Sequence, residues 1–455
     1  MRLHHGIREV GRWAFLSGVA GSAWIGVGVA QLLSGRDLGA GLQPSYVLFA
    51  IAVLAALISE PEFRRRLHGD DLMARWWWLG LGTLLVSGLG LWSSGAGIPL
   101  DLAGARFLRQ ILQWGIMAAI ALLTAHRLLA DARPDRFVIA LAVGIVLQGV
   151  YATVGVWQFS EPSSWFTSLE RLATSNPAIL SGSEELYLGH AFTGIPRVRG
   201  TACEPLYLGN LLIGAIPFFV LQAGRNRRWL LLVALGLGLL LATWSRGAWL
   251  GGIMAGIVAA ALLWRQGYRP GRRLLLALAA VVASGLALMS LLAGPESISL
   301  LIDRLRQSLV REDWSNLTRL YSMEAAWLAF RTSPWWGIGW GQFGFHFPLL
   351  TTPAGLQSQF DWPVVNNLPL QILAESGLIG FGVFCTTAWL LTIRTFRRLR
   401  NAGGLFPSFW LVAAAAAVAG QWFQLLTFSQ YNLPHIWIGL GALLAASAPD
   451  PEVPR

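Results

Sequence analysis

Long apolar stretches alternate with short polar segments along almost the whole of this 455-residue chain. An apolar run of about 17–25 residues is long enough to cross a bilayer as a helix. Twelve such runs occur, near residues 13–33, 43–59, 76–94, 108–126, 137–159, 203–223, 229–244, 247–264, 274–293, 366–392, 406–424 and 432–447. The pattern predicts an all-α, polytopic membrane protein with about 12 transmembrane helices, arranged as a single transmembrane domain over residues 1–455.

The arginines between these runs predict the orientation of the chain. They cluster in every second junction, at Arg64, Arg65, Arg66 and Arg75, at Arg127, Arg133 and Arg136, at Arg225, Arg227 and Arg228, at Arg265, Arg269, Arg272 and Arg273, and at Arg394, Arg397, Arg398 and Arg400. Short arginine-rich loops face the cytoplasm. Both termini are therefore expected in the cytoplasm, and the basic N-terminus is expected to lead into a retained first span rather than a cleaved signal peptide.

Two junctions on the opposite side are long, at residues 160–202 and 294–365. Within the second, residues 298–311 and 316–331 place apolar side chains at helical spacing. We expect two amphipathic helices there, with their apolar sides on lipid or on the helix bundle and their arginines toward a cavity or water. The protein would then carry a large helical periplasmic or extracytoplasmic loop.

The composition fits a membrane protein and argues against a soluble one. Hydrophobic residues make up 55 % of the chain and charged residues 13 %, too few to cover a water-soluble globule of this size. The formal charge of +11 comes from arginines between apolar runs, without the continuous basic face of a nucleic-acid-binding protein. Cys203 and Cys385 lie in different runs and form no disulfide framework. No cofactor and no metal site are expected.

Charged residues at the outer ends of predicted helices form the first candidate site. Arg197, Arg199 and Glu204 lie at the start of the sixth run, and Arg246 lies in the tight turn between the seventh and eighth runs. Charges at a membrane boundary must pair, face water or face a ligand. These arginines therefore either bind an anionic ligand or belong to ion pairs and extend into the interface beside neighbouring tryptophans.

Further polar candidates lie near the long outer loop. Asn367, Gln371 and Glu375 recur every fourth residue, so they share one face of a helix, which either contributes to a site or hydrogen-bonds to neighbouring helices. The Gly-rich stretch 337–344 follows no strand, so close backbone approach is a better interpretation than nucleotide binding. Three histidines on the outer side are possible bases, although single histidines are more often structural: His190, His346 and His435.

Four motifs, in this order, resemble those of the O-antigen ligase and O-antigen polymerase superfamily of bacterial membrane glycosyltransferases. They are Arg197-x-x-Gly-x-x-x-Glu204-Pro, Trp-Ser-Arg246-Gly, Pro-Trp-Trp-Gly-Ile-Gly-Trp-Gly-Gln-Phe, and Asn366-Asn-x-x-Leu-Gln-x-Leu-Ala-Glu375-x-Gly-x-x-Gly. Each motif alone is weak, but the four together are fairly specific. The resemblance covers roughly residues 195–385, and the predicted topology agrees with it outside that range.

The resemblance implies a GT-C-like enzyme in the bacterial inner membrane, with its active site facing the periplasm. Its reaction would be a metal-independent, inverting transfer of a glycan from undecaprenyl diphosphate to a hydroxyl of another glycan or of the lipid A core. The products would be O-antigen or another exopolysaccharide. The arginines implied in binding the diphosphate are Arg197, Arg199 and Arg246, with Arg304 and Arg319 as weaker candidates.

One position departs from the ligase pattern. Ligases usually open the helix after the large loop with a His that acts on the acceptor hydroxyl, whereas this chain has Asn366. Asn cannot accept a proton at neutral pH. Either Glu204 or His346 is the base, or activation of the leaving group suffices and Asn366 only orients the acceptor. The departure favours a polymerase over a ligase.

Two other classes of function are compatible with the sequence. Twelve spans are typical of a multi-span transporter or lipid flippase, although the two halves show no visible symmetry and few charges lie near the membrane midplane. Replacement of the His by Asn366 would also be compatible with a non-catalytic assembly scaffold. Covalent elongation or transfer of a lipid-linked glycan separates the enzyme from both.

Overall fold

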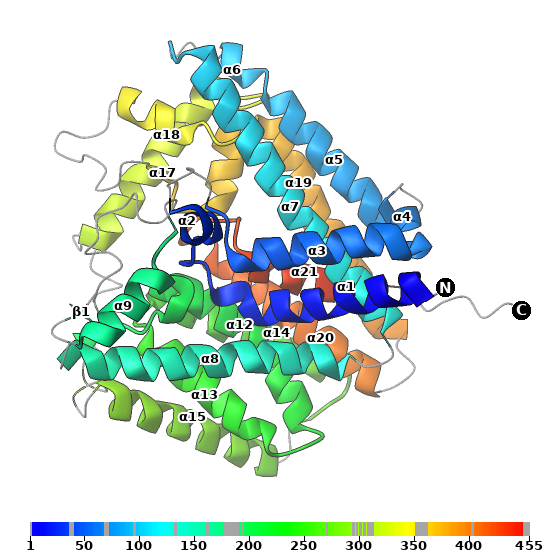
Figure 1. Ribbon diagram of the computed structural model, residues 1–455, viewed down its shortest axis with the longest axis vertical. Coiled ribbons are helices and arrows are strands. Elements are labelled where there is room, and N and C mark those ends of the chain that lie inside the picture. The colour runs from blue at the N-terminus through cyan, green and yellow to red at the C-terminus, as the bar shows by residue number, and fades with distance from the viewer. Residues whose placement is uncertain are drawn as a thin grey trace, which may run out of the picture.

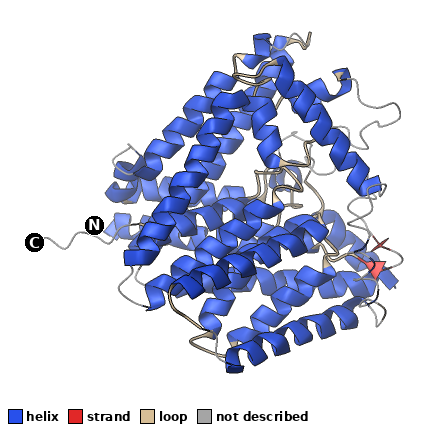
Figure 2. Cartoon of the chain, turned by 180° about the vertical axis from the view of Figure 1, so that it is seen from behind, coloured by secondary structure: helices blue, strands red, loops and turns tan. Residues whose placement is uncertain are grey.

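A computed structural model describes residues 2–35, 41–67, 72–93, 97–131, 134–160, 163–176, 191–192, 195–269, 272–293, 296, 299, 303, 306, 314–350, 363–401 and 405–448. Helices make up most of this part of the chain (Figure 1), and the strands lie at its edge (Figure 2). The first half contains α1 (Arg2–Ala20), η1 (Gly21–Ala23), α2 (Val29–Ser34), α3 (Pro44–Ser59), α4 (Pro61–Leu67), α5 (Leu72–Ser87), α6 (Gly90–Ser93), α7 (Leu100–Ala130), α8 (Asp135–Ser160) and α9 (Ser164–Ala173).

The remaining elements begin with a short antiparallel pair, β1 (Ala191–Phe192) and β2 (Ile195–Pro196). They continue with η2 (Gly200–Ala202), α12 (Pro205–Ala223), α13 (Trp229–Ala242), α14 (Arg246–Arg265), α15 (Arg272–Ala293), α17 (Trp314–Thr332), α18 (Phe343–His346), η3 (Phe347–Leu349), α19 (Leu368–Asn401), α20 (Leu405–Gln424) and α21 (Pro434–Ala446). The all-helical class predicted from the apolar runs is confirmed.

The centre of the bundle is α12, which contacts α8, α13, α14, α20 and α21. Small residues permit the closest crossings in this region. A Cβ added at Gly251 of α14 would lie 2.8 Å from the carbonyl oxygen of Gly420 on α20. In the membrane, helices associate through such close packing because lipid tails are as apolar as the side chains. In Figure 1, α5, α7 and α19 lie on one side of this centre, and α13 and α15 lie on the opposite side.

Each of the twelve predicted runs contains helix, but their lengths differ. Five helices of the described chain are by themselves long and apolar enough to cross a membrane, and the pair α3 and α4, bent by 105°, makes a sixth if it is one span. The five are α7, α8, α12, α14 and α19. The total of about twelve spans stays a prediction.

The first helix differs from the predicted run 13–33. It begins at Arg2 and ends at Ala20, and the chain then runs irregularly past the start of α12. Close backbone contact explains this difference, because the amide of Gly26 donates to the carbonyl oxygen of Thr201 over 3.2 Å and no room remains for a side chain at Gly26. The N-terminal segment therefore supports the loop that precedes α12.

The described residues contain only one of the two amphipathic helices expected in the long loop at residues 294–365. Residues 298–311 lie almost entirely outside the described residues. Residues 316–331 lie within α17, as predicted. Leu320 and Trp327 are 43 % and 48 % exposed, whereas small residues such as Ala325 and Ala329 are buried. The predicted apolar side is thus divided, because Leu320 and Trp327 are exposed whereas Phe330 packs against a buried cluster of the bundle.

A break in α19 fixes its first turns against the Gly-rich segment. Gly377 has φ 64° and ψ −166°, which interrupts the helix. The amides of Leu378 and Ile379 donate to carbonyl oxygens of Pro334 and Trp335, over 2.8 Å and 3.1 Å. A Cβ at Gly377 would lie 2.4 Å from the carbonyl carbon of Trp335, so only glycine fits there. The Gly-rich segment thus serves the close backbone approach that the sequence suggested.

Candidate functional site

The loop before α12 is joined to the turn before α14. The Arg197 guanidinium donates through Nε to the carbonyl oxygen of Thr243 over 3.2 Å, and the amide of Val198 donates to that of Ala242 over 2.9 Å. These bonds place Arg197 within electrostatic reach of Arg246. Burial lowers the pKa of Arg197, the carboxylate of Glu204 raises it, and the charge of Arg246 lowers it again. Two motifs separated in the sequence therefore meet in one charged region.

Each of the two motifs contains a non-glycine residue in the left-handed backbone region. Cys203, with φ 66°, comes directly before Glu204, and Trp244, with φ 53°, comes two residues before Arg246. In the described chain these are the two non-glycine residues with positive φ. Such conformations cost about 1–3 kcal/mol each and persist only where surrounding structure enforces them. Strained backbone conformations cluster at functional sites, so the starts of α12 and α14 are candidates for such a site.

A third element, α17, contributes one polar face to the same region. Asn316, Arg319 and Ser322 are spaced three residues apart and lie along one side of the helix. The Arg246 guanidinium donates from one terminal nitrogen to the Asn316 Oδ1 over 3.1 Å. Arg319 acts electrostatically on Glu204. One helix therefore joins residues from the α12 and α14 starts.

The fourth element is the start of α19. Asn366 donates to the Ser322 hydroxyl oxygen, from its backbone amide over 3.3 Å and from its side-chain nitrogen over 3.1 Å. Asn367 caps the helix, because its Oδ1 accepts from the amide of Leu370 over 2.9 Å. Asn366 is therefore held against the polar face of α17, and Asn367 has a structural contact that explains its presence.

A single turn that follows α20, at residues 425–427, contacts the starts of both α19 and α14. The Asn367 side chain donates to the carbonyl oxygen of Leu426 over 3.1 Å. At the next residue, Thr427, the hydroxyl lies so near Gly247 that a Cβ there would be 2.3 Å away. The turn at residues 425–427 therefore holds the two helix starts together.

Three helix N-termini, those of α12, α14 and α19, thus lie around the polar face of α17. An N-terminus carries a partial positive charge because its first amide groups have no partner within the helix. Arg197, Arg246 and Arg319 add full positive charges, and Glu204 supplies a negative one. Arg246 is only 8 % exposed. An anion with several oxygens, such as a phosphate or diphosphate, is the ligand that this arrangement suits.

Glu204 has the electrostatic environment of a proton acceptor. It directly precedes Pro205, the first residue of α12, and burial raises the pKa of its carboxyl to about 7. Three positive charges oppose that rise: Arg197, Arg199 and Arg319. A pKa near the ambient pH suits a general base, because the group is often ionised and still holds a proton well.

Arg199 has a different main partner from the other arginines. It forms an ion pair with Glu170 on α9, and Glu170 also accepts a hydrogen bond from the Tyr151 hydroxyl on α8. Burial lowers the pKa of Arg199. The sequence did not predict α9, although Trp165, Leu169 and other apolar residues follow helical spacing there. This pair fastens the loop before α12 to α9, and the Tyr151 hydrogen bond ties α9 to α8.

Gln371 and Glu375 complete the predicted polar stripe but lie beside the break in α19. The Glu375 carboxylate accepts from the backbone amide of Phe343 and from the Gln371 side chain, each over 3.0 Å. Arg106 of α7 acts electrostatically on the same carboxylate. Glu375 therefore hydrogen-bonds to the start of α18, as the hydrogen-bonding alternative expects, whereas the Gln371 bond stays within α19.

The last two predicted residues are His346 and Arg304. His346 ends α18, is 4 % exposed, and has a pKa lowered to about 4 by burial. A base with so low a pKa accepts protons poorly at neutral pH. Arg304 lies outside the described residues.

Sequence reasoning missed Asn316, Ser322 and Glu170. A signal for the first two existed, since they flank Arg319 at intervals of three residues on a helix that the sequence did predict. Glu170 had no such signal, because its partner Arg199 is 29 positions away and only the fold brings them together.

The fold and the site define a polytopic helical membrane protein with an arginine-rich region beside helix N-termini. Residues 230–385 match the family model described as O-antigen ligase, so this segment of the chain is similar to that family. The matched segment contains Arg246, α17 and Asn366. A comparison with curated proteins finds no match. The family implies a glycosyltransferase-like activity with a lipid-linked glycan as donor and a glycan as acceptor.

Proposed function

We propose that this protein is an O-antigen polymerase, or a closely related polymerase of exopolysaccharide, that uses undecaprenyl-diphosphate-linked repeat units. The observation that carries the proposal is the meeting of Arg197, Arg246 and Arg319 with Glu204 beside the N-termini of α12, α14 and α19. A diphosphate leaving group gains negative charge as its bond to the sugar breaks. Preorganised guanidinium groups and helix N-termini stabilise that charge where it develops.

The proposed reaction is a single displacement at the anomeric carbon of the donor sugar. The acceptor hydroxyl oxygen forms the new bond to this carbon, and the bond from the carbon to the diphosphate oxygen breaks. The diphosphate leaves with the electron pair, and the hydroxyl proton passes to a base. Attack from the face opposite the leaving group inverts the configuration of the anomeric carbon. No step requires a metal ion, because Arg197 and Arg246 supply the positive charge.

Glu204 is the base that we assign. Its pKa of about 7 suits proton transfer near neutral pH, and its neighbouring arginines stand where the diphosphate would bind. His346 is the weaker candidate because burial lowers its pKa to about 4. Asn366 then orients the acceptor through its amide, with Ser322 fixing the rotamer.

Asn366 also favours a polymerase over a ligase. A His at this position would supply a base to the acceptor hydroxyl, and an amide supplies none. The start of α19 therefore holds an orienting group, as in members of the superfamily that open this helix with Asn-Asn. We place the active site at the periplasmic face of the bacterial inner membrane, with both termini cytoplasmic, because the arginine-rich short loops lie at the other ends of these helices.

The glycan phenotype of a deletion strain tests this proposal. A polymerase mutant is expected to accumulate single, unpolymerised repeat units, and a plasmid carrying the wild-type gene should restore the polymer. Complete polymer stranded on its lipid carrier would instead identify a ligase.

A further inference from the structure

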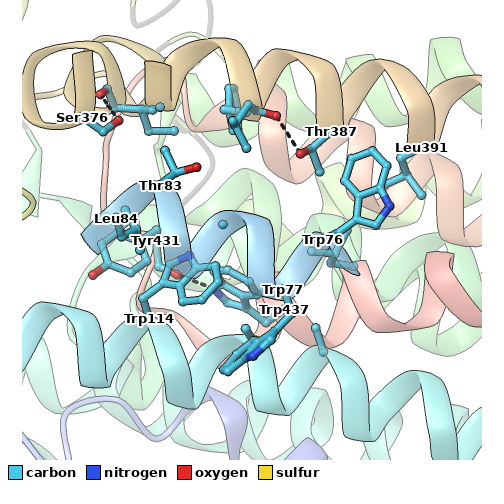
Figure 3. A pocket seen from close by; sticks show the side chains of 18 of the residues that line it. Trp76, Trp77, Thr83, Leu84, Trp114, Ser376, Thr387, Leu391, Tyr431 and Trp437 are labelled. Carbon is cyan, nitrogen blue, oxygen red and sulfur yellow. Dashed lines mark hydrogen bonds between the residues drawn. The ribbon is translucent and has the colours of Figure 1, made fainter. Parts of the chain in front are cut away.

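Polar side chains inside the bundle differ in which element they hold. In the apolar pocket along α19, the Ser376 hydroxyl donates to the carbonyl oxygen of Ile372 over 2.6 Å, and the Thr387 hydroxyl donates to that of Val383 over 2.7 Å (Figure 3). Such bonds stay within one helix and fix no other element. In α8, by contrast, Gln148 is 0 % exposed, and its amide group bonds to the loop before α12.

The amide group of Gln148 bonds to Thr201 at two points. Gln148 Oε1 accepts from the backbone amide of Thr201 over 2.8 Å, and Gln148 Nε2 donates to the Thr201 hydroxyl oxygen, also over 2.8 Å. The Thr201 hydroxyl donates in turn to the carbonyl oxygen of Ala23 over 3.3 Å. Because the side-chain amide is planar and offers both a donor and an acceptor, the two bonds fix the orientation of Thr201 as well as its position.

The loop requires this support because its backbone is strained. Thr201 lies between Gly200, with φ 58°, and Cys203, with φ 66°. Only glycine fits at position 200, where a Cβ would overlap the side-chain oxygen of Gln148. A left-handed conformation at a non-glycine residue such as Cys203 persists only where surrounding contacts enforce it. Glu204 follows directly, so the contacts that fix this loop also fix the base.

A second contact from α8 reaches the same loop through α9. Tyr151 lies three residues after Gln148, on the same face of the helix, and its hydroxyl donates to the Glu170 carboxylate. Glu170 forms the ion pair with Arg199, two residues before Thr201. One face of α8 thus holds the loop both directly and through α9.

We infer that Gln148 is a positioning residue, which holds the loop at Thr201 so that the Glu204 carboxyl stays buried among its neighbouring arginines. The inference rests on the proposed function for the role of Glu204 as the base. Gln148 acts on the reaction only through the loop, because its bonds go to Thr201.

Loss of this support should show in the proton affinity of Glu204. Burial raises the pKa of Glu204 to about 7. Three positive charges oppose that rise: Arg197, Arg199 and Arg319. The Cys203 thiol, whose pKa burial raises to about 12, is a further titratable group beside it. A substitution at Gln148 alters none of these groups, so a change in the pKa of Glu204 would report a change in its position or hydration.

The variant Gln148→Met tests the inference, because methionine keeps the length of the side chain but cannot form the two bonds to Thr201. The assay measures kcat/KM for chain elongation against pH with the reconstituted protein. Water that enters around the loosened loop should lower the pKa of the acid limb by at least about one pH unit, and the plateau should fall about 10–100-fold. A limb that stays at about 7 in a folded Gln148→Met protein would overturn the inference, since loss of stability alone does not move it.

Matched variants separate positioning from stability. Thr201→Val removes the hydroxyl and should move the limb in the same direction, whereas Thr201→Ser keeps the hydroxyl and should resemble wild type. If Gln148→Met does not fold, this pair decides, and equal profiles of the two would overturn the inference. Gln222, at the other end of α12, is buried and donates to Asp135 over 2.7 Å. Gln222→Met should leave the limb in place, and an equal movement of the limb there would refute a specific role of Gln148.

Infrared titration of Glu204 distinguishes failure of this inference from failure of the proposed function, because it requires no turnover. The carboxyl band that is lost in Glu204→Gln is followed against pH in wild type and in Gln148→Met. A midpoint that falls in Gln148→Met, in a protein that transfers no glycan, would support the positioning and refute the proposed function. Glycan transfer with a midpoint and a pH profile that the substitution leaves unchanged would refute the positioning and leave the function standing.

Discussion

Replacement of Arg246 by alanine is the sharpest perturbation of the site. Arg246 is the first residue of α14, is 8 % exposed, and is oriented by a 3.1 Å hydrogen bond to Asn316. Removing one preorganised donor from a developing oxyanion costs about 2.7–4 kcal/mol, or about 10²–10³-fold in kcat. We expect Arg246→Ala to lower the turnover rate by that factor.

Two further variants separate charge from geometry. Arg246→Lys keeps the positive charge but loses the planar fork that binds two phosphate oxygens, so its rate should lie between those of alanine and wild type. Arg265, at the other end of the same helix, is exposed and stacks on Phe396 at 5.2 Å. Arg265→Ala removes the same charge from the same helix far from the site, and it should leave turnover unchanged.

The assay measures initial rates of chain elongation by purified, reconstituted protein on a polyprenyl-diphosphate-linked oligosaccharide. Thermal unfolding of each variant excludes loss of the fold as the cause. The Ser245 cap remains in Arg246→Ala, where its hydroxyl accepts from the amide of Ala248 over 3.4 Å, so the helix start should persist. A folded Arg246→Ala protein with a rate within about threefold of wild type, far short of the loss expected for an oxyanion donor, would refute the assigned role.

Three other predictions follow from the same geometry. If Glu204 is the base, kcat/KM should rise about tenfold per pH unit on the acid side, level off above a pKa of about 7, and lose this limb in Glu204→Gln; a profile unchanged by that substitution would exclude Glu204. Asn366→Ala should lower the rate up to about tenfold, the worth of one neutral hydrogen bond, and Ser322→Ala should act similarly; a complete loss would mean that Asn366 does more than orient the acceptor. Gly247→Ala should destabilise the fold by about 1–3 kcal/mol, because its Cβ would lie 2.3 Å from the Thr427 hydroxyl, with partial recovery in combination with Thr427→Ala, as measured by thermal unfolding; an unchanged melting temperature would contradict this packing.

The helices were predictable because apolar run length depends on local sequence alone. The regions of α12, α14 and α19 follow directly from their runs, and the amphipathic spacing of residues 316–331 predicted α17. The end of α1 at Ala20 was not predictable in this way. Its cause is the packing of Gly26 against Thr201, two residues that only the fold brings together.

The candidate site was predictable in its charges but not in its connections. Arg197, Glu204 and Arg246 stand out because charge at a membrane boundary requires a partner. The spacing of Asn316 and Ser322 around Arg319 is visible in the sequence, but polar residues are ordinary on a surface helix, and the role of these two depends on the direction in which α17 packs. The partner of Arg199 likewise lies on α9, a helix that the sequence did not reveal.

The most direct test of the central claim gives wild-type protein a single substrate. Vesicles containing the protein and a polyprenyl-diphosphate-linked single repeat unit, with no other acceptor, are assayed for glycan length and for released polyprenyl diphosphate. We predict a ladder of longer lipid-linked glycans, with one polyprenyl diphosphate released for each repeat added. Movement of the intact repeat across the vesicle membrane, without elongation or release, would contradict the claim and indicate a transporter or flippase.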